Sequence, residues 1–272
     1  MLCAVLLACD GKETGMGDES PTVPTPLQMV RPDHFPPMVI PPDNPMTEQG
    51  VELGRKLFFD PILSIDSTKA CGSCHLPDAS FSDPDQFSEG VAGITGRNSM
   101  PIVNAGWMPA LFWDGRAESL EAQALQPVTN RVEMGETWDH VVEKLSRHPD
   151  YPILFAAAFG DGEISSDRVA KAIAQFERTL ISGTSRFDRF LNGEGDYSEE
   201  EALGFELFNS EIGDCFHCHG TVLMTDNQFH NNGLDSMPAD SGLAAVTGNT
   251  FDLGKFKSPS LRNVEYTAPY MH

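Results

Sequence analysis

The sequence has few basic residues, since 18 Lys and Arg stand against 40 Asp and Glu and give a formal net charge of −22. Binding to nucleic acid requires clustered Lys and Arg, so this class of function is excluded. An acidic surface suits a basic protein partner, but it also serves solubility alone. The charge therefore excludes one class of ligand and leaves the choice of protein partner open.

A long apolar run is also missing, and none of the runs present could span a bilayer. The opening residues 1–9 are apolar but short, and they end in Leu6-Leu7-Ala8-Cys9. This ending resembles a bacterial lipobox, in which the cysteine is lipidated, although the basic region of a signal peptide is absent. We therefore predict a partial signal peptide over residues 1–9 with a lipid anchor at Cys9. A short apolar terminus is the alternative.

Cysteine is scarce outside two short motifs. Four of the six cysteines lie in those motifs, and the other two, Cys3 and Cys9, lie in the opening run. No pair therefore remains that looks like a structural disulfide. The alternating pattern of β-strands is missing at any length, whereas helical periodicity recurs. We predict an all-α fold with long loops.

The pentapeptide Cys-X-X-Cys-His occurs twice, at Cys71-Gly72-Ser73-Cys74-His75 and at Cys215-Phe216-His217-Cys218-His219. This is the spacing of c-type haem attachment, in which two thiols bond to the porphyrin and the histidine binds the iron. Chance would give roughly 0.004 such motifs in a chain of this composition. Zinc is the alternative ligand, but zinc does not require a histidine directly after both cysteine pairs. We predict two covalently bound haems and redox chemistry.

The location of the protein follows from this haem type. Haem of the c type is attached after export in bacteria, so we predict a periplasmic protein. If Cys9 is lipidated, the protein is a membrane-anchored lipoprotein, and its only contact with the membrane is that anchor.

Composition and helical signals divide the rest of the chain. Residues 10–45 are rich in proline and form a linker or an extended strap. A helix is predicted from Thr47 to Phe59, and residues 61–116 form a long loop region that would wrap a haem. Further helices are predicted after Ser119, over 137–147 and over 150–159, and another is predicted to follow a cap at Ser166 or Asp167. A turn at 192–196 separates a first haem domain, 46–192, from a second, 193–272.

The second domain opens with a capping box at Ser198-Glu199-Glu200-Glu201, followed by a helix that is predicted to turn Leu203, Leu207 and Phe208 inward. Its Leu203-Gly204-X-X-Leu207-Phe208 echoes Leu53-Gly54-X-X-Leu57-Phe58 in the helix before the first motif. This weak repeat predicts two related cytochrome c-like domains.

Strings of residues around the two motifs resemble the bacterial dihaem cytochrome c peroxidases and the MauG-type dihaem oxidases of the same superfamily. The resemblance extends over residues 40–272. The strings are Leu53-Gly54-Arg55-Lys56-Leu57-Phe58-Phe59-Asp60-Pro61, Gly96-Arg97-Asn98-Ser99-Met100-Pro101, Phe112-Trp113-Asp114-Gly115-Arg116-Ala117, Glu133-Met134, Phe256-Lys257-Ser258-Pro259-Ser260-Leu261-Arg262-Asn263 and Thr267-Ala268-Pro269-Tyr270-Met271-His272.

The resemblance implies a division of labour between the haems. The first haem, with His75 proximal, is the peroxidatic one, and the second, with His219 proximal, receives electrons from outside. Trp113 corresponds to the tryptophan that lies between the haems, where its π system can relay an electron. Read alone, Trp113 would be a buried core aromatic.

The resemblance also implies a distal pocket and a calcium site. Gln123 and Glu133 follow Trp113 at the family spacing, so Glu133 is the expected proton shuttle and Gln123 would orient peroxide or water. Read alone, Glu133 would be a solvated surface charge. The implied calcium ligands are the side chain of Asn98 and the carbonyl oxygens of Thr267 and Pro269.

Two departures from the family pattern stand out. The loop from Leu76 to Gly96 contains no histidine, and the position of the histidine that caps the oxidised peroxidatic iron holds Val91 or a residue close to it. We therefore predict a protein that is active without a reductive switch, as in the MauG-type branch. The segment that carries the distal ligand of the second haem in the family would follow His272, so the second domain is predicted to be truncated.

The predicted function is the reduction of hydrogen peroxide to water, with electrons from a small cytochrome c or cupredoxin. A homodimer is the expected assembly. Two alternatives stay open: a MauG-type oxidase that modifies a protein substrate, and a dihaem electron carrier without catalysis. A pure carrier needs no distal acid–base group, so the spacing of Gln123 and Glu133 disfavours the carrier.

Overall fold

The computed structural model describes residues 23–270, and its regular structure is almost entirely helical. The helices are α1 (Glu48–Phe59), α2 (Cys71–Cys74), α3 (Leu120–Thr129), α4 (Trp138–Arg147), α5 (Tyr151–Phe159), α6 (Ser166–Arg178), α7 (Arg186–Leu191), α8 (Glu199–Phe208), α9 (Phe216–His219) and α10 (Ala244–Thr247). This confirms the helix-rich class. The predicted lipid anchor at Cys9 lies outside the described residues.

Strands are limited to two antiparallel pairs of two residues each. β1 (Glu89–Gly90) pairs with β2 (Gly93–Ile94), and β3 (Phe229–His230) pairs with β4 (Phe256–Lys257). Such short strands leave no alternating pattern in the sequence. Among the described residues, no helix has the length and apolar character that a bilayer crossing requires.

The predicted helix starts depend on side-chain caps, and the structure contains most of them. A side-chain oxygen accepts a hydrogen bond from the first turn of α1, α3, α4 and α8 at Thr47, Ser119, Thr137 and Ser198. The cap of α6 is Ser165, whose Oγ accepts from the backbone N–H of Arg168 at 3.3 Å. The prediction of Ser166 or Asp167 was therefore wrong by one or two residues, because the short polar residues in this run are all capable caps.

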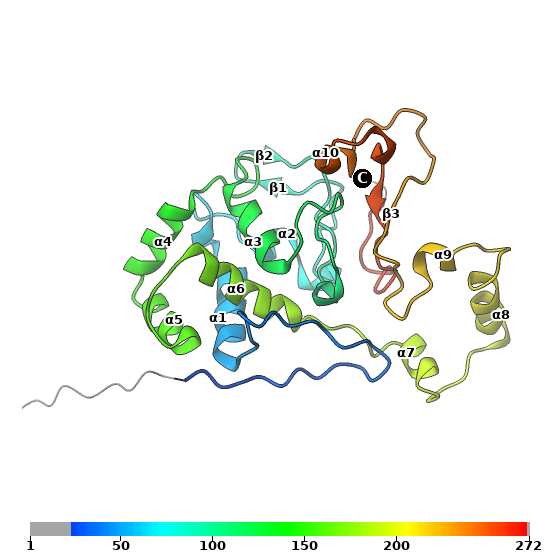
Figure 1. Ribbon diagram of the computed structural model, residues 1–272, viewed down its shortest axis with the longest axis horizontal. Coiled ribbons are helices and arrows are strands. Elements are labelled where there is room, and N and C mark those ends of the chain that lie inside the picture. The colour runs from blue at the N-terminus through cyan, green and yellow to red at the C-terminus, as the bar shows by residue number, and fades with distance from the viewer. Residues whose placement is uncertain (1–22, 271–272) are drawn as a thin grey trace, which may run out of the picture.

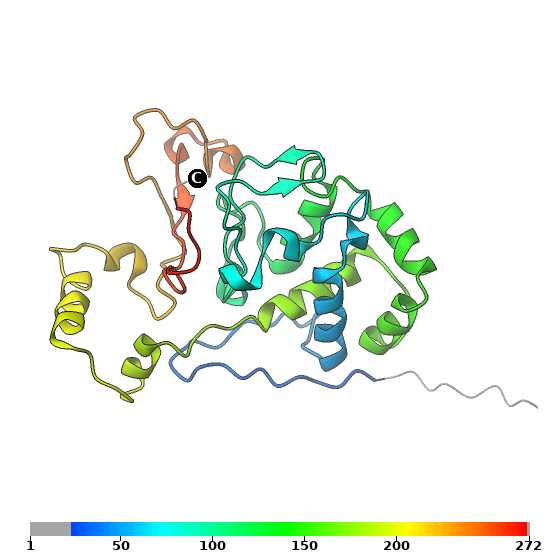
Figure 2. The ribbon, with the colours of Figure 1, turned by 180° about the vertical axis from the view of Figure 1, so that it is seen from behind.

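The main core lies where α1 packs against α6, and the two helices cross at an oblique angle in both ribbon views (Figures 1 and 2). Leu53, Leu57 and Phe58 of α1 are at most 1 % exposed and pack against the buried face of α6. Gly54 allows this contact, since a Cβ atom there would stand 1.8 Å from the carbonyl oxygen of Ala172. The helix before the first motif is thereby fixed against the body of the first domain.

Gly54→Ala is expected to destabilise the protein by about 1–3 kcal/mol, because the added methyl group must push α1 and α6 apart. The measurement is the free energy of unfolding of the haem-loaded protein in denaturant. Glu52→Ala on the exposed face of the same helix is the matched control, with an expected change within about 0.5 kcal/mol. Equal stability of the two variants would contradict the close helix contact.

The described part of the proline-rich segment is an extended strap that lies under α1 and α6 and reaches α7 (Figures 1 and 2). Phe35 is only 2 % exposed, and His34 Nε2 lies 2.7 Å from Asp188 Oδ1 in α7. Near its other end, Asn44 Oδ1 accepts a hydrogen bond from Gln175 of α6 at 2.8 Å. Of the two interpretations, linker or strap, the strap describes residues 23–46.

The C-terminal part of the described chain is held to the first part by Arg262. Its guanidinium forms a buried ion pair with Asp188 at 2.8 Å and lies 4.5 Å from the ring centroid of Phe35. Arg262 Nε also donates to the carbonyl of Val222, in the loop after the second motif. The strap, α7 and the loop after the second motif therefore all contact the side chain of Arg262.

The packing predicted for α8 was wrong for Leu203 and Leu207. Leu203 is 56 % exposed and Leu207 is 41 % exposed, and α8 has no buried residue. Gly204 lines a cavity beside the second motif, whereas its counterpart Gly54 is in tight contact with another helix. The sequence repeat is therefore not matched by packing, because periodicity shows which side chains are apolar and not what covers them.

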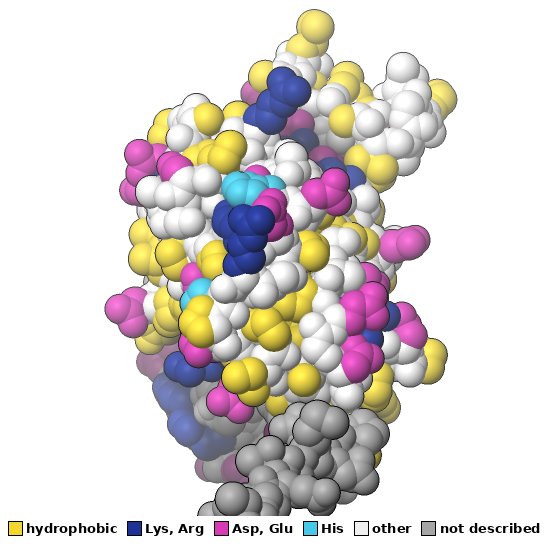
Figure 3. All heavy atoms as spheres, turned by 90° about the vertical axis from the view of Figure 1, so that its left-hand side faces the viewer, with side chains coloured by type: hydrophobic (Ala, Val, Ile, Leu, Met, Phe, Trp, Pro, Cys, Tyr) yellow, Lys and Arg dark blue, Asp and Glu magenta, His cyan; other side chains and the backbone are white. Residues whose placement is uncertain are grey.

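The surface reflects the acidic composition. The face in Figure 3 carries acidic side chains at many separate places among apolar and uncharged ones. Several basic side chains are paired with acidic ones, as in the contact of Lys144 Nζ with Glu136 Oε2 at 2.8 Å. The net negative charge is thus distributed over the surface.

Candidate functional site

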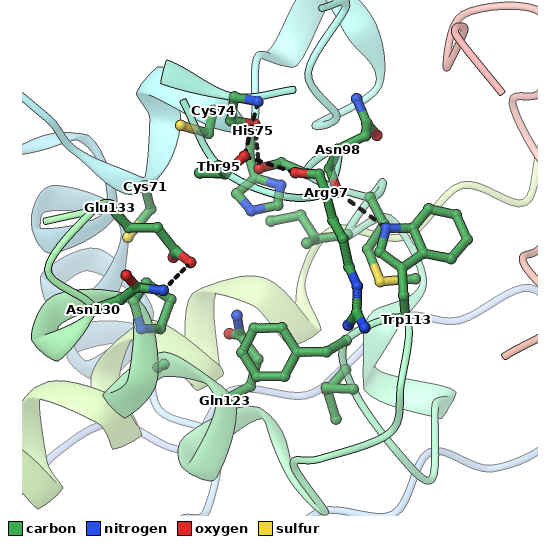
Figure 4. Close-up of a pocket in the computed structure, with 18 of the residues that line it drawn as sticks. Cys71, Cys74, His75, Thr95, Arg97, Asn98, Trp113, Gln123, Asn130 and Glu133 are labelled. Atoms are coloured by element: carbon green, nitrogen blue, oxygen red, sulfur yellow. Dashed lines mark hydrogen bonds between the residues drawn. The ribbon is translucent and has the colours of Figure 1, made fainter. Parts of the chain in front are cut away.

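A cavity of about 390 Å³ lies beside the first Cys-X-X-Cys-His motif (Figure 4). The predicted site residues that line it come from sequence positions up to 62 residues apart: Cys71, Cys74, His75, Asn98, Trp113, Gln123 and Glu133. In Figure 4, Cys71 and Glu133 lie on one side, Trp113 lies on the opposite side, and Gln123 lies below. The structure therefore brings these seven residues around one space.

The two thiols of the first motif come from a single helical turn. Cys71 and Cys74 are the first and last residues of α2, so their side chains point to the same side. The turn is fixed by Ser73, whose Oγ accepts from the backbone N–H of Ala70 at 3.0 Å. Burial raises the pKa of Cys71 to about 12, so this thiol is protonated at neutral pH.

The ring of His75 is oriented by a backbone carbonyl. Nδ1 lies 3.0 Å from the carbonyl oxygen of Phe81, and because a carbonyl can only accept, Nδ1 carries the proton. Nε2 is then the nitrogen with a free lone pair. Burial also lowers the pKa of His75, which favours the neutral ring. A neutral imidazole with a fixed donor is the form that binds a metal.

The second motif repeats this arrangement. His219 Nδ1 lies 3.1 Å from the carbonyl oxygen of Met224. In both loops the accepting residue has a left-handed backbone, with φ of 58° at Phe81 and 55° at Met224. Left-handed backbone is uncommon for such bulky residues, and it recurs at functional sites. Neither Phe81 nor Met224 is recognisable as a histidine-orienting residue from sequence.

A second cavity, also about 390 Å³, lies beside the second motif. It is lined by His219 and Met224 and by aromatic side chains from α7, α8 and the turn between them: Phe187, Tyr197, Phe205 and Phe208. Phe208, which was predicted to face inward, therefore faces this cavity. Its aromatic walls suit a flat apolar group.

Glu133 projects from a tight turn that Asn130 organises. The Asn130 backbone carbonyl accepts from the N–H of Met134 and of Gly135, and Asn130 Nδ2 donates to Glu133 Oε1 at 2.7 Å. Burial raises the pKa of Glu133, and the charge of Arg116 partly offsets this effect. A half-buried carboxyl with a raised pKa is suited to exchange protons.

The histidine-free loop is pinned to the same turn. The N–H of Val91 donates to the carbonyl of Glu133 at 2.9 Å, and the N–H of Ala92 donates to the carbonyl of Val132 at 3.2 Å. A Cβ at Gly90 would stand 1.9 Å from the Val132 carbonyl oxygen, so only glycine fits there. The hairpin β1–β2 is therefore fixed against the residues that carry Glu133.

Trp113 lies where the residues around the first motif meet the C-terminal segment that contains β4. Its Nε1 donates to the carbonyl of Asn98 at 3.0 Å, and its own carbonyl accepts from the N–H of Lys257 in β4 at 2.8 Å. The Lys257 side chain is 1 % exposed, and its Nζ donates to the carbonyl of Ala110 at 2.6 Å. Burial lowers the pKa of Lys257 to about 8. Sequence reasoning missed this buried lysine, although it lies within a family string.

The three predicted calcium ligands do not line one common cavity. Asn98 Nδ2 donates to the carbonyls of Asp83 and Asp85 at 2.9 and 2.7 Å, which fixes the side-chain amide and turns Oδ1 away from these carbonyls. Thr267 is buried, but neither Thr267 nor Pro269 lines the cavity that Asn98 lines. Oxygen donors of this kind suit calcium.

The donor set of the first cavity fits a c-type haem. One wall carries two thiols and a neutral imidazole, and the other walls are largely apolar, with Ile102, Leu111, Phe112, Leu120, Ala124 and Ile173. A zinc site would require the two thiols of a motif to converge on one metal ion. Among residues 23–270, two groups of three potential metal ligands converge, and neither contains both cysteines of a motif.

Comparison with known proteins gives consistent matches. The family model described as "Di-haem cytochrome c peroxidase" matches residues 48–196. Methylamine utilization protein MauG of Methylophilus methylotrophus is 38 % identical over 256 residues, which are 93 % of this chain and 76 % of that protein. Cytochrome-c peroxidase IdrP1 of Pseudomonas sp. (strain SCT) is 35 % identical, over 88 % of this chain and 72 % of that protein.

A solved structure is similar throughout the described fold. It is a MauG-like protein associated with microbial copper homeostasis, with a TM-score of 0.84 and 39 % sequence identity. The match covers 89 % of this chain and 77 % of that one.

Proposed function

The chain belongs to the di-haem cytochrome c peroxidase family, and we propose that it reduces hydrogen peroxide to water at a haem held by Cys71, Cys74 and His75. The observation that carries this proposal is the first cavity, which is lined by a haem donor set and also by Glu133 and Gln123. An electron carrier needs only the residues that hold the haem. A peroxidase also needs acid–base residues such as Glu133 beside it.

Glu133 would carry out the proton transfer between the two peroxide oxygens. A haem held in the first cavity by Cys71, Cys74 and His75 would supply the iron centre at which peroxide is reduced. The reduction of one peroxide to two waters consumes two electrons and two protons. As a carboxylate, Glu133 can accept the proton of the nearer peroxide oxygen and donate it to the farther one, so that water leaves. The bond from Asn130 fixes the carboxyl, and Gln123 would orient peroxide.

Electrons would reach the first cavity through Trp113. Its indole is held by the carbonyl of Asn98 and its backbone is bonded to Lys257, so it bridges the two parts of the chain. The second haem, on Cys215, Cys218 and His219, would receive electrons from a small cytochrome c or cupredoxin. A basic donor is favoured, because the net charge of −22 attracts it over a distance.

The proposal extends to the cellular setting. Covalent haem attachment by both motifs implies a periplasmic protein, and the lipid anchor at Cys9 and the homodimer stay part of the proposal. Calcium bound by Asn98, Thr267 and Pro269 would stiffen the junction of the two parts, where Trp113 bonds to Asn98.

One assay tests the function. We expect the purified dihaem protein to oxidise a reduced small cytochrome c when hydrogen peroxide is added. Peroxide-driven oxidation of a protein substrate without turnover of that donor would support the MauG-type alternative. Failure to react with peroxide at all would support an electron carrier and overturn the proposal.

We expect the oxidised protein to react with peroxide at full rate without prior reduction. The loop from Leu76 to Gly96 holds no histidine, and the Val91 side chain lies near Gly135 rather than along the cavity. Electron paramagnetic resonance of the oxidised protein as isolated should contain a high-spin component. Two purely low-spin signals, or a rate that rises only after prior reduction, would contradict this expectation.

A further inference from the structure

Glu177 is a buried carboxyl that the proposed mechanism does not use. It lies in α6, one turn after Ile173, and both residues line the first cavity together with Cys71. Glu177 is 5 % exposed, and its Oε2 is buried without a hydrogen-bond partner among the described residues. A native protein rarely leaves a buried carboxyl oxygen without a partner, so such an atom calls for a functional explanation.

The nearest cation is already engaged by another acid. Arg178 Nη1 lies 2.8 Å from Glu121 Oε1 in α3, at an angle unsuited to a hydrogen bond, and Nη2 donates to Glu121 Oε2 at 3.1 Å. Glu121 also accepts from Asn44 Nδ2 at 2.6 Å. The charge of Arg178 is therefore shared with Glu121, and Glu177 has no cation of its own.

The elements packed against α6 add little compensating charge. From α3 the facing charged group is Glu121, which disfavours a second negative charge. From α1 the buried side chains are apolar, and its charged residues Glu48, Glu52, Arg55 and Lys56 are exposed. Burial therefore dominates and raises the pKa of Glu177 to about 8, with Arg178 opposing and Glu121 adding to the rise.

We propose that Glu177 is a redox-linked proton site of the first haem, which binds a proton when that haem gains an electron and releases it when the electron leaves. The step balances, because one electron comes from the external donor and one proton comes from solvent. In a water-poor cavity, an added negative charge and a nearby carboxylate repel each other strongly, and the proton removes this repulsion. The inference rests on the proposed haem in the first cavity.

This role would matter for the reaction at a pH near or above 8, where Glu177 can lose its proton while the haem is oxidised. Each peroxide consumes as many protons as electrons, and a site that stores a proton with an electron keeps the net charge of the cavity unchanged when the haem is reduced. Glu133 and Glu177 would then have different roles. Glu133 would transfer protons on the peroxide, and Glu177 would set the charge of the cavity.

The test is the reduction potential of each haem as a function of pH, measured by spectroelectrochemistry on the dihaem protein between pH 6 and 10. For the wild type, we expect the equilibrium constant for reducing the first haem to fall by up to tenfold per pH unit near pH 8, which is about 59 mV for one electron. The second haem should show no such dependence and serves as an internal control.

Glu177→Gln should remove the dependence. Below pH 7 its potential should match that of the wild type, because an amide resembles the protonated acid, and above pH 8 it should stay high. Glu143→Gln, on the exposed face of α4, is the matched control and should keep the wild-type curve. A flat curve for the wild type, or an unchanged slope in Glu177→Gln, would overturn the proposal.

This outcome is separable from the proposed function. The potentials are read without peroxide, so a protein inert to peroxide can still show the dependence on Glu177. Conversely, an active peroxidase with a flat wild-type curve would keep its function and lose this proton site. A flat wild-type curve overturns the proposal without any variant.

Discussion

Replacing Glu133 by glutamine is expected to lower the rate of reaction with hydrogen peroxide by about 10²-fold or more. The amide keeps the shape of the side chain and the contact with Asn130, but it cannot accept the peroxide proton. Haem content and absorption spectra should stay those of the wild type. Stopped-flow reaction of the dihaem protein with peroxide measures the rate.

The pH dependence gives a second signature of Glu133. Its pKa is raised by burial, so the carboxylate is lost as the pH falls through a value above the ordinary 4.5. The wild-type rate should therefore decrease on the acid side, and this decrease should be missing in Glu133→Gln. Glu143→Gln, which is exposed on α4, should keep both rate and profile. A Glu133→Gln rate equal to the wild-type rate would remove Glu133 from the mechanism.

Replacing the cysteines of one motif by serine is expected to halve the covalently bound haem. Serine hydroxyls do not form the thioether bonds, so Cys71→Ser with Cys74→Ser should lose the first haem. Cys215→Ser with Cys218→Ser should lose the second. Haem that survives acid extraction, measured per chain, counts the attachment sites directly.

The two double variants should also differ in function. Without the first haem, the protein should not react with peroxide. Without the second, it should still react with peroxide but should no longer turn over with a reduced cytochrome c. If the two variants lost the same activity, the division of roles between the motifs would be wrong.

Local signals in the sequence predicted local structure well. Thr47, Ser119, Thr137 and Ser198 were recognisable as caps, because a cap needs only a short polar side chain before a helical pattern. The same logic could have found α7, which was missed, since Ser185 and Asp188 form a capping box. There the apolar pattern is only six residues long.

Features that depend on backbone conformation or on burial could not be predicted from the sequence. The carbonyls of Phe81 and Met224 orient the two histidines only because their backbones are left-handed, and side-chain type does not indicate this. Glu177 and Lys257 look like ordinary charged residues until packing buries them. The inward prediction for Leu203 failed for the same reason, since a pattern of apolar residues does not specify its partner.

The candidate site was predicted mainly by resemblance. The two Cys-X-X-Cys-His motifs identify haem from chemistry alone, whereas Glu133 and Gln123 have no local signal that separates them from surface residues. The structure adds that both line the cavity of the first motif, together with Trp113. Thr267 and Pro269 do not line it, and their role in binding calcium stays a prediction.

The central claim is tested most directly by the stoichiometry of the reaction with an external donor. Known amounts of hydrogen peroxide are added to the dihaem protein with excess reduced small cytochrome c, and the oxidised cytochrome is measured by its absorbance. The account predicts two oxidised cytochromes for each peroxide, because reduction to water takes two electrons. Consumption of peroxide without oxidation of the cytochrome would contradict it.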